Sequence, residues 1–444
     1  INSYFARVGY TYKDRYLMTL TGRVDGSSRF GANNKYGFFP SIGLGWILSE
    51  EDFLSETDFV NRLKLRASYG VTGNTEITPY STLATISSST VLINGERVNE
   101  SFVTRLPNPD VGWETTTQLD VGVELSTNTN PQINLEVDYY YKLTEDLLLN
   151  RPIPRSTGFS SLRDNIGSVS NRGVDLSLGS LYAKDNFTWE SVFNLNYNKN
   201  RIEELGANDE DIFPGPNFVS GSNTILRVGE PVASFWGLER LGVWGTAEAA
   251  EAAAVGALPG EARRSSERTI IGNGLPVWTG SFINNFRLGR FDFTMDLQFV
   301  FDVDILQQAL HSTEDRSGIA NGLRTILTEG WTPQNQNTQV QEIRNQGTSG
   351  QNSQVDSRWV ADGSYLRGNL FTLGYTFSDA FVDSIGLSML RVYGSVDNAF
   401  VLQSDGFQGY DPEGSSNNSQ FGQNIFFFQY PRPRTFTLGF NLKF

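Results

Sequence analysis

The sequence predicts an all-β protein, a transmembrane antiparallel β-barrel, from three observations. Apolar and polar residues alternate with a period of two in many segments of the 444-residue chain, and this period is typical of strands. Aromatic residues make up 13% of the chain and glycine contributes 44 residues, a composition that favours strands and turns over helices. Finally, the connections between these segments alternate between short and long, as they do in outer-membrane barrels.

The alternation begins at the N-terminus. Tyr4–Tyr12 and Tyr16–Val24 place apolar residues at every second position, and a tight Lys13-Asp14 turn joins them. The aromatic residues beside this turn resemble the aromatic girdle at a membrane interface. Two further strands are predicted at Pro40–Leu48 and Leu63–Val71.

The central strands carry acidic residues on one face. In the predicted strands Gln118–Leu125 and Ile133–Tyr141, large apolar residues alternate with polar ones that include Asp120, Glu124, Glu136 and Asp138. A carboxylate at every second position belongs in water, and its neighbours belong in lipid. These carboxylates could steer a substrate, but we expect most of them to be solvated or paired with inward Arg and Lys. The same alternation predicts strands near Val174–Leu178 and Phe187–Tyr197, a hairpin over Phe282–Asp302, and a hairpin formed by Tyr365–Phe377 and Leu387–Val396.

The last segment, Pro433–Phe444, shows the pattern most clearly. Its twelve residues, at roughly 3.3 Å each, cross the core of a bilayer when the strand is tilted. A strand of a soluble sandwich could look alike, but the repetition of the pattern elsewhere favours exposure to lipid. The apolar face consists of Phe436, Leu438, Phe440, Leu442 and Phe444.

The connections predict the orientation of the strands, because barrels of this kind have short periplasmic turns and long extracellular loops. The short connections are Lys13-Asp14, Ser126–Pro131, Ala183–Asn186, Gly289-Arg290 and Ser378–Ser384, with Ser49–Asn61 as a longer periplasmic turn. The long ones are Asp25–Phe39, Thr72–Thr115, Asp146–Ser170, Asn198–Val277, Asp304–Ser364 and Asn398–Arg432. Thr246–Ala257 is rich in Ala and Glu and predicts a short helix.

The predicted strands number thirteen, or fifteen if Val232–Trp244 folds back as a membrane hairpin. Both counts are odd, whereas bacterial single-chain barrels have even numbers of strands. We therefore expect that residues 1–444 do not close a barrel alone. The start of the chain, Ile1 to Tyr4, is not a signal peptide, and we expect an N-terminal part of the polypeptide to lie outside this sequence.

Composition excludes several classes of function. The chain has no Cys and one His, His311, so disulfides, thiolate metal sites and histidine-based zinc or triad chemistry are not expected. The formal net charge of −14 argues against nucleic-acid binding, which needs clusters of Lys and Arg. No run of about 18 apolar residues predicts a transmembrane helix, and no P-loop or G-x-S-x-G motif occurs. We expect no catalytic residue, no bound metal and no cofactor.

An ordered series of motifs resembles the SusC/RagA family of TonB-dependent transporters of Bacteroidetes. The resemblance runs along the whole chain, and the succession of motifs is far more specific than any one of them. The motifs are Asp25-Gly-Ser-Ser-Arg-Phe-Gly31, Phe39-Pro-Ser-Ile-Gly-Leu-Gly-Trp46, Leu63-Lys-Leu-Arg-Ala-Ser-Tyr-Gly-Val-Thr-Gly-Asn74, Asn108-Pro-Asp-Val-Gly-Trp-Glu114, Asn165-Ile-Gly-Ser-Val-Ser-Asn-Arg-Gly173, Asp362-Gly-Ser-Tyr-Leu366, Gly409-Tyr-Asp-Pro-Glu413 and the terminal Phe444.

This resemblance implies a 22-stranded barrel with a plugged lumen in the bacterial outer membrane. Residues 1–444 would then be the C-terminal part of one barrel domain, and the N-terminal plug, the TonB box and the first strands would lie outside this chain. The family implies coupling to TonB through that absent region and a SusD-like surface lipoprotein as partner. By strand order, Thr72–Thr115 corresponds to the hinge loop that contacts this partner. Other expected contacts are outer-membrane lipid, lipopolysaccharide and a glycan or peptide substrate.

Five tryptophans in or near the long loops are candidate substrate-binding residues, because aromatic faces stack on sugar rings: Trp236, Trp244, Trp278, Trp331 and Trp359. Loop cores and membrane girdles also use Trp. Two acidic loops invite a cation-binding interpretation. Asp25–Gly31 lacks the spaced carboxylates of a calcium loop, so we expect Arg29 to pair with other loops instead. For Asp405–Glu413, beside Asn417 and Asn418, loop packing is again favoured over ion binding.

The C-terminus carries a further signal. Phe440, Leu442 and Phe444 match the C-terminal signature that the outer-membrane assembly machinery reads. A closing strand would also need an apolar face, so the alternation alone does not separate the two interpretations. The terminal aromatic carboxylate favours the assembly signal.

Active import of a nutrient too large for porins, with TonB and a SusD-like lid, is the first functional hypothesis. The alternative is a structural or secretion-associated barrel that keeps the fold without uptake. A passive porin would need an open lumen, which the long loops and the resemblance argue against.

Overall fold

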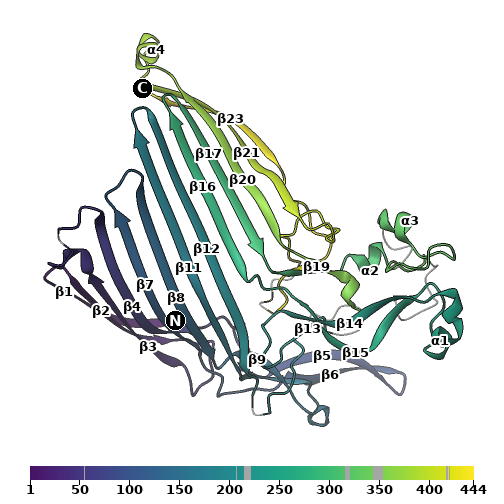
Figure 1. Ribbon diagram of the computed structural model, residues 1–444. Helices are drawn as coiled ribbons and strands as arrows, with labels where there is room; N and C mark the ends of the chain where they lie inside the picture. The colour runs from purple at the N-terminus through teal and green to yellow at the C-terminus, as the bar shows by residue number, and fades with distance from the viewer. Residues whose placement is uncertain are drawn as a thin grey trace. The chain divides into compact units, whose positions relative to one another are not determined.

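The computed structural model describes residues 1–54, 56–206, 208–214, 222–315, 321–343, 354–416, 419 and 421–444. Within these residues thirteen strands form one sheet, in the order β1-β2-β3-β4-β7-β8-β11-β12-β16-β17-β20-β21-β23 (Figure 1). Their bounds are β1 Asn2–Tyr12, β2 Tyr16–Gly26, β3 Tyr36–Ile47, β4 Val60–Asn74, β7 Glu114–Thr127, β8 Gln132–Glu145, β11 Ser168–Lys184, β12 Phe187–Glu204, β16 Trp278–Leu288, β17 Phe291–Phe301, β20 Tyr365–Thr376, β21 Met389–Gln403 and β23 Thr435–Lys443.

The predicted set of thirteen spanning strands is confirmed, because every predicted segment is a strand of this sheet. Many predicted bounds are shorter than the observed ones, although Pro433–Phe444 and Tyr365–Phe377 extend beyond β23 and β20. Val174–Leu178, for example, is only the centre of β11, which runs from Ser168 to Lys184. In β11 the ladder hydrogen bonds continue beyond the point where the apolar alternation ends, so the pattern there marks the centre of the strand and not its full length.

The alternative with fifteen membrane strands is wrong. Residues of Val232–Trp244 form β14 (Ser234–Val243), which pairs with β13 (Thr224–Ile225) and β15 (Ala262–Asn273) in a separate sheet. The side chain of Arg240 in β14 is buried among carboxylates. A strand that carries such a charge belongs in a protein interior and not against lipid.

The register of the sheet aligns large apolar side chains across strands. One row joins six exposed residues on one face of successive strands, β1 to β8, and consists of Val8, Leu20, Ile42, Tyr69, Leu119 and Tyr141. Such a continuous apolar row is costly in water and favourable in a bilayer. The predicted lipid-facing side of the sheet is therefore supported by cross-strand register as well as by alternation.

The two ends of the strand order are β1 and β23. β1 pairs with β2 and β23 pairs with β21, and the strand order does not join β1 to β23. This agrees with the expectation that residues 1–444 do not close a barrel alone.

The long connections contain secondary structure of their own, which alternation did not predict. They hold the hairpin of β5 (Thr85–Ile93) and β6 (Glu96–Arg105), the hairpin of β9 (Leu148–Pro152) and β10 (Ser161–Asn165), and a sheet of β18 (Asp304–Gln307), β19 (Val360–Asp362) and β22 (Ile425–Phe426). The helices are α1 (Ala249–Ala254), α2 (Leu310–Thr313), α3 (Thr325–Glu329) and α4 (Asp379–Ser384). The predicted helix at Thr246–Ala257 is confirmed as a 3-10 turn followed by α1. The predicted turn Ser378–Ser384 contains α4.

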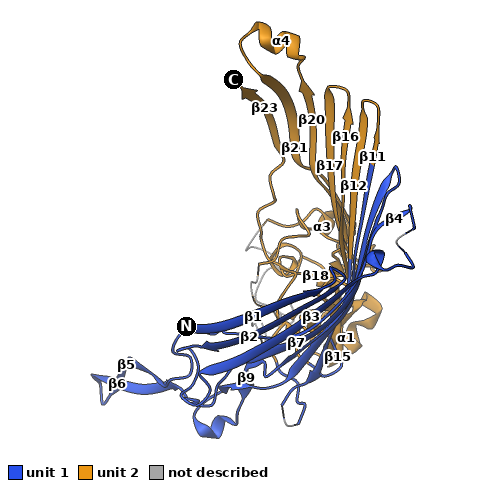
Figure 2. Cartoon of the chain, turned by 90° about the vertical axis from the view of Figure 1, so that its left-hand side faces the viewer, with its two compact units in different colours: residues 1–181, 196–212, 227–230 blue, residues 182–195, 213–226, 231–444 orange. Residues whose placement is uncertain are grey.

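The chain divides into two compact units (Figure 2), unit 1 with residues 1–181, 196–212 and 227–230, and unit 2 with the remainder. The buried apolar clusters lie mainly in the loops of each unit. In unit 1, Phe30, Ile77, Val111 and Leu148 pack together. In unit 2 one cluster consists of Phe235, Leu306, Leu310, Val355, Trp359 and Ile425. Among the described residues, no helix is long and apolar enough to cross a membrane.

Candidate functional site

The long loops of unit 1 are held together by the motifs that the sequence singled out. Arg29 donates from Nη1 to the carbonyl oxygen of Thr75, at 3.1 Å, so the predicted pairing of Arg29 with another loop is confirmed. The amide of Gly31 donates to the carbonyl oxygen of Val111, at 2.9 Å. A Cβ at Gly31 would overlap the backbone of Pro109, and only glycine permits this close approach.

Two asparagines extend this loop cluster. Asn165 makes a reciprocal pair with Gly112, accepting from its amide at 2.7 Å and donating to its carbonyl oxygen at 3.1 Å. Asn108 donates to the carbonyl oxygen of Arg163, at 2.9 Å. The three sequence motifs that contain Arg29, Asn108 and Asn165 therefore form one packed assembly, and they act by positioning loops.

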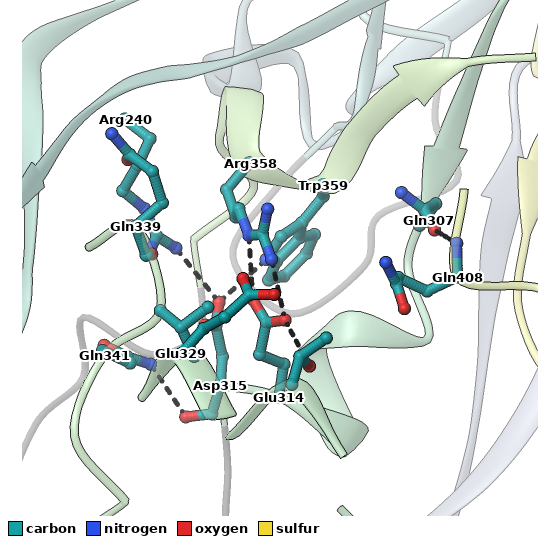
Figure 3. Close-up of polar contacts among 12 residues, drawn as sticks. Arg240, Gln307, Glu314, Asp315, Glu329, Gln339, Gln341, Arg358, Trp359 and Gln408 are labelled. Carbon is teal, nitrogen blue, oxygen red and sulfur yellow. Dashed lines mark hydrogen bonds and ion pairs between the residues drawn. The ribbon is translucent and has the colours of Figure 1, made fainter. Parts of the chain in front are cut away.

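In unit 2 a buried cluster of charges joins three segments that are far apart in the sequence (Figure 3). Arg240 of β14 lies 2.7 Å from Asp356 and 3.3 Å from Asp315, measured from Nη2 to the Oδ2 atoms, and the Arg240 side chain is 1% exposed. Arg264 of β15 lies 2.5 Å from Asp356, from Nε to Oδ2. Asp315 and Asp356 are both fully buried.

Neighbouring polar groups complete this cluster. The Trp359 indole donates from Nε1 to Oδ2 of Asp315 at 2.8 Å. Arg358 holds Glu314 with two hydrogen bonds, at 3.0 and 3.1 Å, and Figure 3 shows these two side chains beside Trp359. The carbonyl oxygen of Gln339 accepts from Nη1 of Arg240 at 2.9 Å. The charge cluster is defined as Arg240, Arg264, Glu314, Asp315, Asp356 and Arg358. In it Arg240 and Arg264 contact Asp315 and Asp356, and Arg358 contacts Glu314.

The electrostatics of the charge cluster follow from burial and proximity. Burial raises the pKa of Asp315, while Arg240 and Arg264 act in the opposite direction. For Arg240, burial lowers the pKa, but the nearby Asp315 and Asp356 outweigh it and the net pKa is raised. Arg240 thus remains a cation in the interior. The cluster braces β14, β15 and the segment around Asp356 against one another.

A second buried arginine fixes the last long loop. Arg367 of β20 is fully buried and lies 2.5 Å from Oδ1 of Asp411 and 3.3 Å from Oε2 of Glu413. It also donates to Oδ1 of Asn398, at 2.5 Å. The loop-packing interpretation of Asp405–Glu413 is therefore confirmed for its two C-terminal carboxylates. Asn417 and Asn418, which the ion-binding interpretation also used, lie outside the described residues, and in the described parts of the chain no group of acidic residues and His forms a metal site.

The five predicted tryptophans do not share one site. Trp359 is fully buried and Trp331 is 5% exposed, so neither presents a free ring face to a ligand in this structure. Burial has a clear cause for Trp359, since it packs in the apolar cluster with Phe235 and donates to Asp315. A stacking role for these two would require the loops to open.

The other three tryptophans have accessible surface. Trp236 is half-buried with its ring centroid 6.0 Å from that of Phe213. Trp244 is half-buried, and the guanidinium of Arg263 lies 4.8 Å from its ring centroid. Trp278, the first residue of β16, is 38% exposed. Substrate contact by these residues stays a prediction.

An exposed apolar hairpin is a candidate that the alternation analysis missed. The β5–β6 hairpin lies inside the Thr72–Thr115 loop, and Figure 2 shows it projecting beyond the sheet of unit 1. Large apolar side chains on it are solvent-exposed, with Ile86 at 71% and Leu92 at 72%. The Asn94-Gly95 pair, which has positive φ at both residues, is a strong hairpin signal and could have identified it.

Three of the four predicted inward carboxylates are paired with cations, and the fourth, Asp120, accepts from Nε2 of Gln118 at 3.0 Å. Arg66 contacts Glu124 at 2.8 Å, and it also contacts Glu136 and Asp138. Lys64 lies 3.0 Å from Glu124. The expectation that Arg and Lys of the same face pair with these carboxylates is confirmed for Glu124, Glu136 and Asp138, which leaves little free charge to steer a substrate.

The C-terminal residues are exposed on the last strand. Phe444 is 89% exposed, and Phe440 and Leu442 are also exposed. Ser388 donates from its amide to the carbonyl oxygen of Lys443 at 2.7 Å, which fixes the end of β23 against β21. These positions leave the apolar side chains accessible, and their role as an assembly signal stays a prediction.

Comparison with known proteins places these features in a family context. The family described as TonB dependent receptor-like, β-barrel, matches residues 1–304. TonB-dependent receptor P3 of Formosa agariphila is 37% identical over 100% of this chain and 45% of its own length. TonB-dependent receptor SusC of Bacteroides thetaiotaomicron is 30% identical over 100% of this chain and 43% of its own length.

Among solved structures, that of the RagAB peptide transporter is similar over 100% of this chain and 47% of the matched chain, with a TM-score of 0.82 and 26% identity. A structure of the RagAB peptide importer in its open-open state matches with a TM-score of 0.80. The present chain spans about half the length of the relatives it matches.

Proposed function

The chain belongs to the TonB-dependent receptor β-barrel family, of the SusC/RagA type, and we propose that it forms part of a transporter that imports a large nutrient across the bacterial outer membrane. The family consists of outer-membrane proteins, and this chain is part of one. The proposed cargo is an oligosaccharide or an oligopeptide. Uptake would be driven through TonB by parts of the protein outside these residues.

One observation carries this proposal. The similarity to the RagAB peptide transporter has a TM-score of 0.82 and covers 100% of this chain. Loops that only had to join strands could be short. The long loops of this chain are instead braced by buried ion pairs of Arg240 and Arg367, as expected of loops that must present a defined surface.

In this proposal residues 1–444 are the C-terminal part of one barrel domain. The plug and the remaining strands, up to about 22 in a barrel of this class, would come from the rest of the protein. The exposed edges at β1 and β23 support this arrangement, because an unpaired strand edge within a membrane leaves backbone groups without partners.

We also propose a SusD-like lipoprotein as the partner. The β5–β6 hairpin supports it, because Ile86, Leu92 and Val103 are exposed on one of its faces and a partner would cover such apolar side chains. By strand order, we expect the loop that holds this hairpin to be the hinge loop of the family. Catalysis has no support, since the relatives are receptors and transporters.

The test is deletion of the gene for the whole protein, followed by uptake of fluorescent oligosaccharides and oligopeptides by intact cells. The proposal predicts loss of uptake of one of these classes and retention of the other. Unchanged uptake of both classes would contradict import and favour a structural or secretion-associated barrel. Pull-down of a SusD-like lipoprotein with the wild-type protein, and its loss with Ile86→Asp and Leu92→Asp together, tests the partner.

The half-buried tryptophans offer a finer test of the substrate surface. Trp236→Ala and Trp244→Ala should each weaken uptake if their rings stack on cargo, whereas the conservative Phe variants should retain most of it. Equal uptake by the Ala variants would remove these residues from the proposed surface.

A further inference from the structure

The outward face of the first strands of unit 1 carries an apolar hollow of about 810 Å³. It lies over β1, β2, β3, β4 and β7, and its lining includes Tyr10, Tyr12, Tyr16, Trp46, Ala67 and Val121. These residues belong to the alternating set that faces lipid. The intervening row of Leu17, Gly45, Arg66 and Gly122 also contributes to the lining. The hollow therefore opens toward the membrane on the apolar face of the sheet.

The register explains why a hollow forms at this place. One cross-strand row reads Tyr10, Met18, Leu44, Ala67, Val121. Ala67 is the smallest side chain of this row, and it lies between Leu44 and Val121. Tyr69 lies two residues after Ala67 in β4, in the neighbouring cross-strand row on the side of the long loops, and its large side chain is exposed. A small residue surrounded by large ones leaves a depression that a flexible hydrocarbon chain can fill.

The wall of the hollow nearest the short turn is rigid. The rings of Tyr12 and Tyr16 stack with centroids 6.3 Å apart, and those of Tyr16 and Trp46 stack at the same distance. Glu51 accepts from the Tyr16 hydroxyl at 2.6 Å and from Nε1 of Trp46 at 2.9 Å. Arg15 in turn donates to Glu51 at 2.9 Å. This arrangement holds the aromatic rings before any ligand arrives, which lowers the entropic cost of binding.

The end of the hollow at the short turn carries charge. Lys13 and Asp14 form the tight turn directly beyond Tyr12, and Nζ of Lys13 lies 5.5 Å from the centroid of the Tyr12 ring. Both turn residues are exposed, and neither makes an ion pair with another described residue. Short turns of outer-membrane barrels face the periplasm, where aromatic residues mark the level of the lipid head groups.

We propose that this hollow is a binding site for one phospholipid of the periplasmic leaflet, with an acyl chain over Ala67 and the head-group phosphate at Lys13. The apolar floor fits the hydrocarbon chain, and the aromatic wall lies at the depth of the glycerol region. A lysine beside a lipid phosphate is a favourable contact. Asp14 suits the ammonium of a phosphatidylethanolamine head group. The site depends on the outer-membrane location alone and not on the nature of the cargo.

The experiment is a titration of the delipidated full-length transporter in detergent with dioleoyl phosphatidylethanolamine, followed by native mass spectrometry. The wild-type protein should bind a first lipid more tightly than later ones. Ala67→Trp fills the hollow and should weaken this first step about tenfold or more, the loss expected when a few methylene groups leave an apolar contact. Leu20→Trp, on the same face outside the lining, is the matched control and should bind as the wild type does.

Further variants separate the parts of the site. Lys13→Glu should weaken the first step for the phospholipid and leave binding of dioleoylglycerol, which has no phosphate, unchanged. Val121→Phe fills the hollow from another strand and provides a second test should Ala67→Trp fail to give a folded, heat-modifiable band. If the wild type and both filling variants bind the first lipid with the same affinity as later ones, only annular lipid is present and the proposal is overturned. Conversion of a wild-type dimer to monomers by Ala67→Trp, without change in lipid binding, would assign the hollow to a second copy and also overturn it.

Discussion

Asp356→Asn is the substitution that tests the braced loops most sharply. Asp356 is fully buried and accepts from Nε of Arg240 at 2.8 Å, from Nε of Arg264 at 2.5 Å and from the amide of Arg358 at 3.0 Å. The amide keeps the shape of the carboxylate but removes its charge. Two buried guanidinium groups then face Asp315 alone, and breaking a buried pair in this way costs about 3–5 kcal/mol.

This cost should be expressed as local opening of the loops, because the spanning sheet does not depend on Asp356. At about 1.4 kcal/mol per tenfold change, 3–5 kcal/mol corresponds to opening that is roughly a hundred to several thousand times more frequent. Hydrogen exchange can report this loop opening at two backbone amides. The amide of Leu238 donates to the carbonyl oxygen of Val355, and the amide of Trp359 donates to the carbonyl oxygen of Asp356.

The matched control is Glu267→Gln, an exposed carboxylate on β15. It should leave exchange at both amides unchanged. Exchange rates in Asp356→Asn within about threefold of the wild type, an effect of under roughly 1 kcal/mol, would refute the idea that the charge cluster braces this part of the chain.

Three further perturbations have defined outcomes. Arg367→Leu should leave the acidic pair of the last long loop without its cation, and proteolysis of that loop in the folded protein should become at least roughly tenfold faster. Gly122→Ala places a Cβ against the carboxylate of Asp138, so we expect the barrel to lose about 1–3 kcal/mol of stability. This loss should appear as a lower temperature of the heat-modifiability transition. A Gly→Ala substitution at an open position should leave that temperature unchanged. Hydrogen bonds from Tyr16 and from the Trp46 indole lower the pKa of Glu51 below its ordinary value of 4.5. The stability that ionised Glu51 contributes is therefore complete above pH 4.5 and is lost as the pH falls through the lowered pKa. The fluorescence of Trp46 should change in that acidic range in the wild type and not in Glu51→Gln.

Period-two alternation predicted the spanning strands because lipid imposes a strict rule on every second side chain. The same rule does not apply in the loops. β14, for example, has the length of a membrane strand, but its burial against β15 and around Arg240 follows from tertiary packing that no local pattern shows.

The candidate site was predictable only in part. Arg29 was expected to reach another loop, and it contacts Thr75, because an arginine in a tight polar turn has few other partners. The tryptophans were selected by residue type and loop position, which does not distinguish an exposed ring from a buried one such as Trp359. The contacts of Arg240 with Asp315 and Asp356 join residues 75 and 116 positions apart, and one sequence carries no signal for such pairs.

The central claim is TonB-driven import by the protein that contains this chain. Its most direct test is uptake of a labelled cargo, of the class that the deletion identifies, by otherwise identical cells with functional and with disrupted TonB. The proposal predicts that surface binding of the cargo persists in both strains and that accumulation inside the cell stops when TonB is lost. Accumulation at an unchanged rate without TonB would contradict the proposal and indicate a passive or structural barrel.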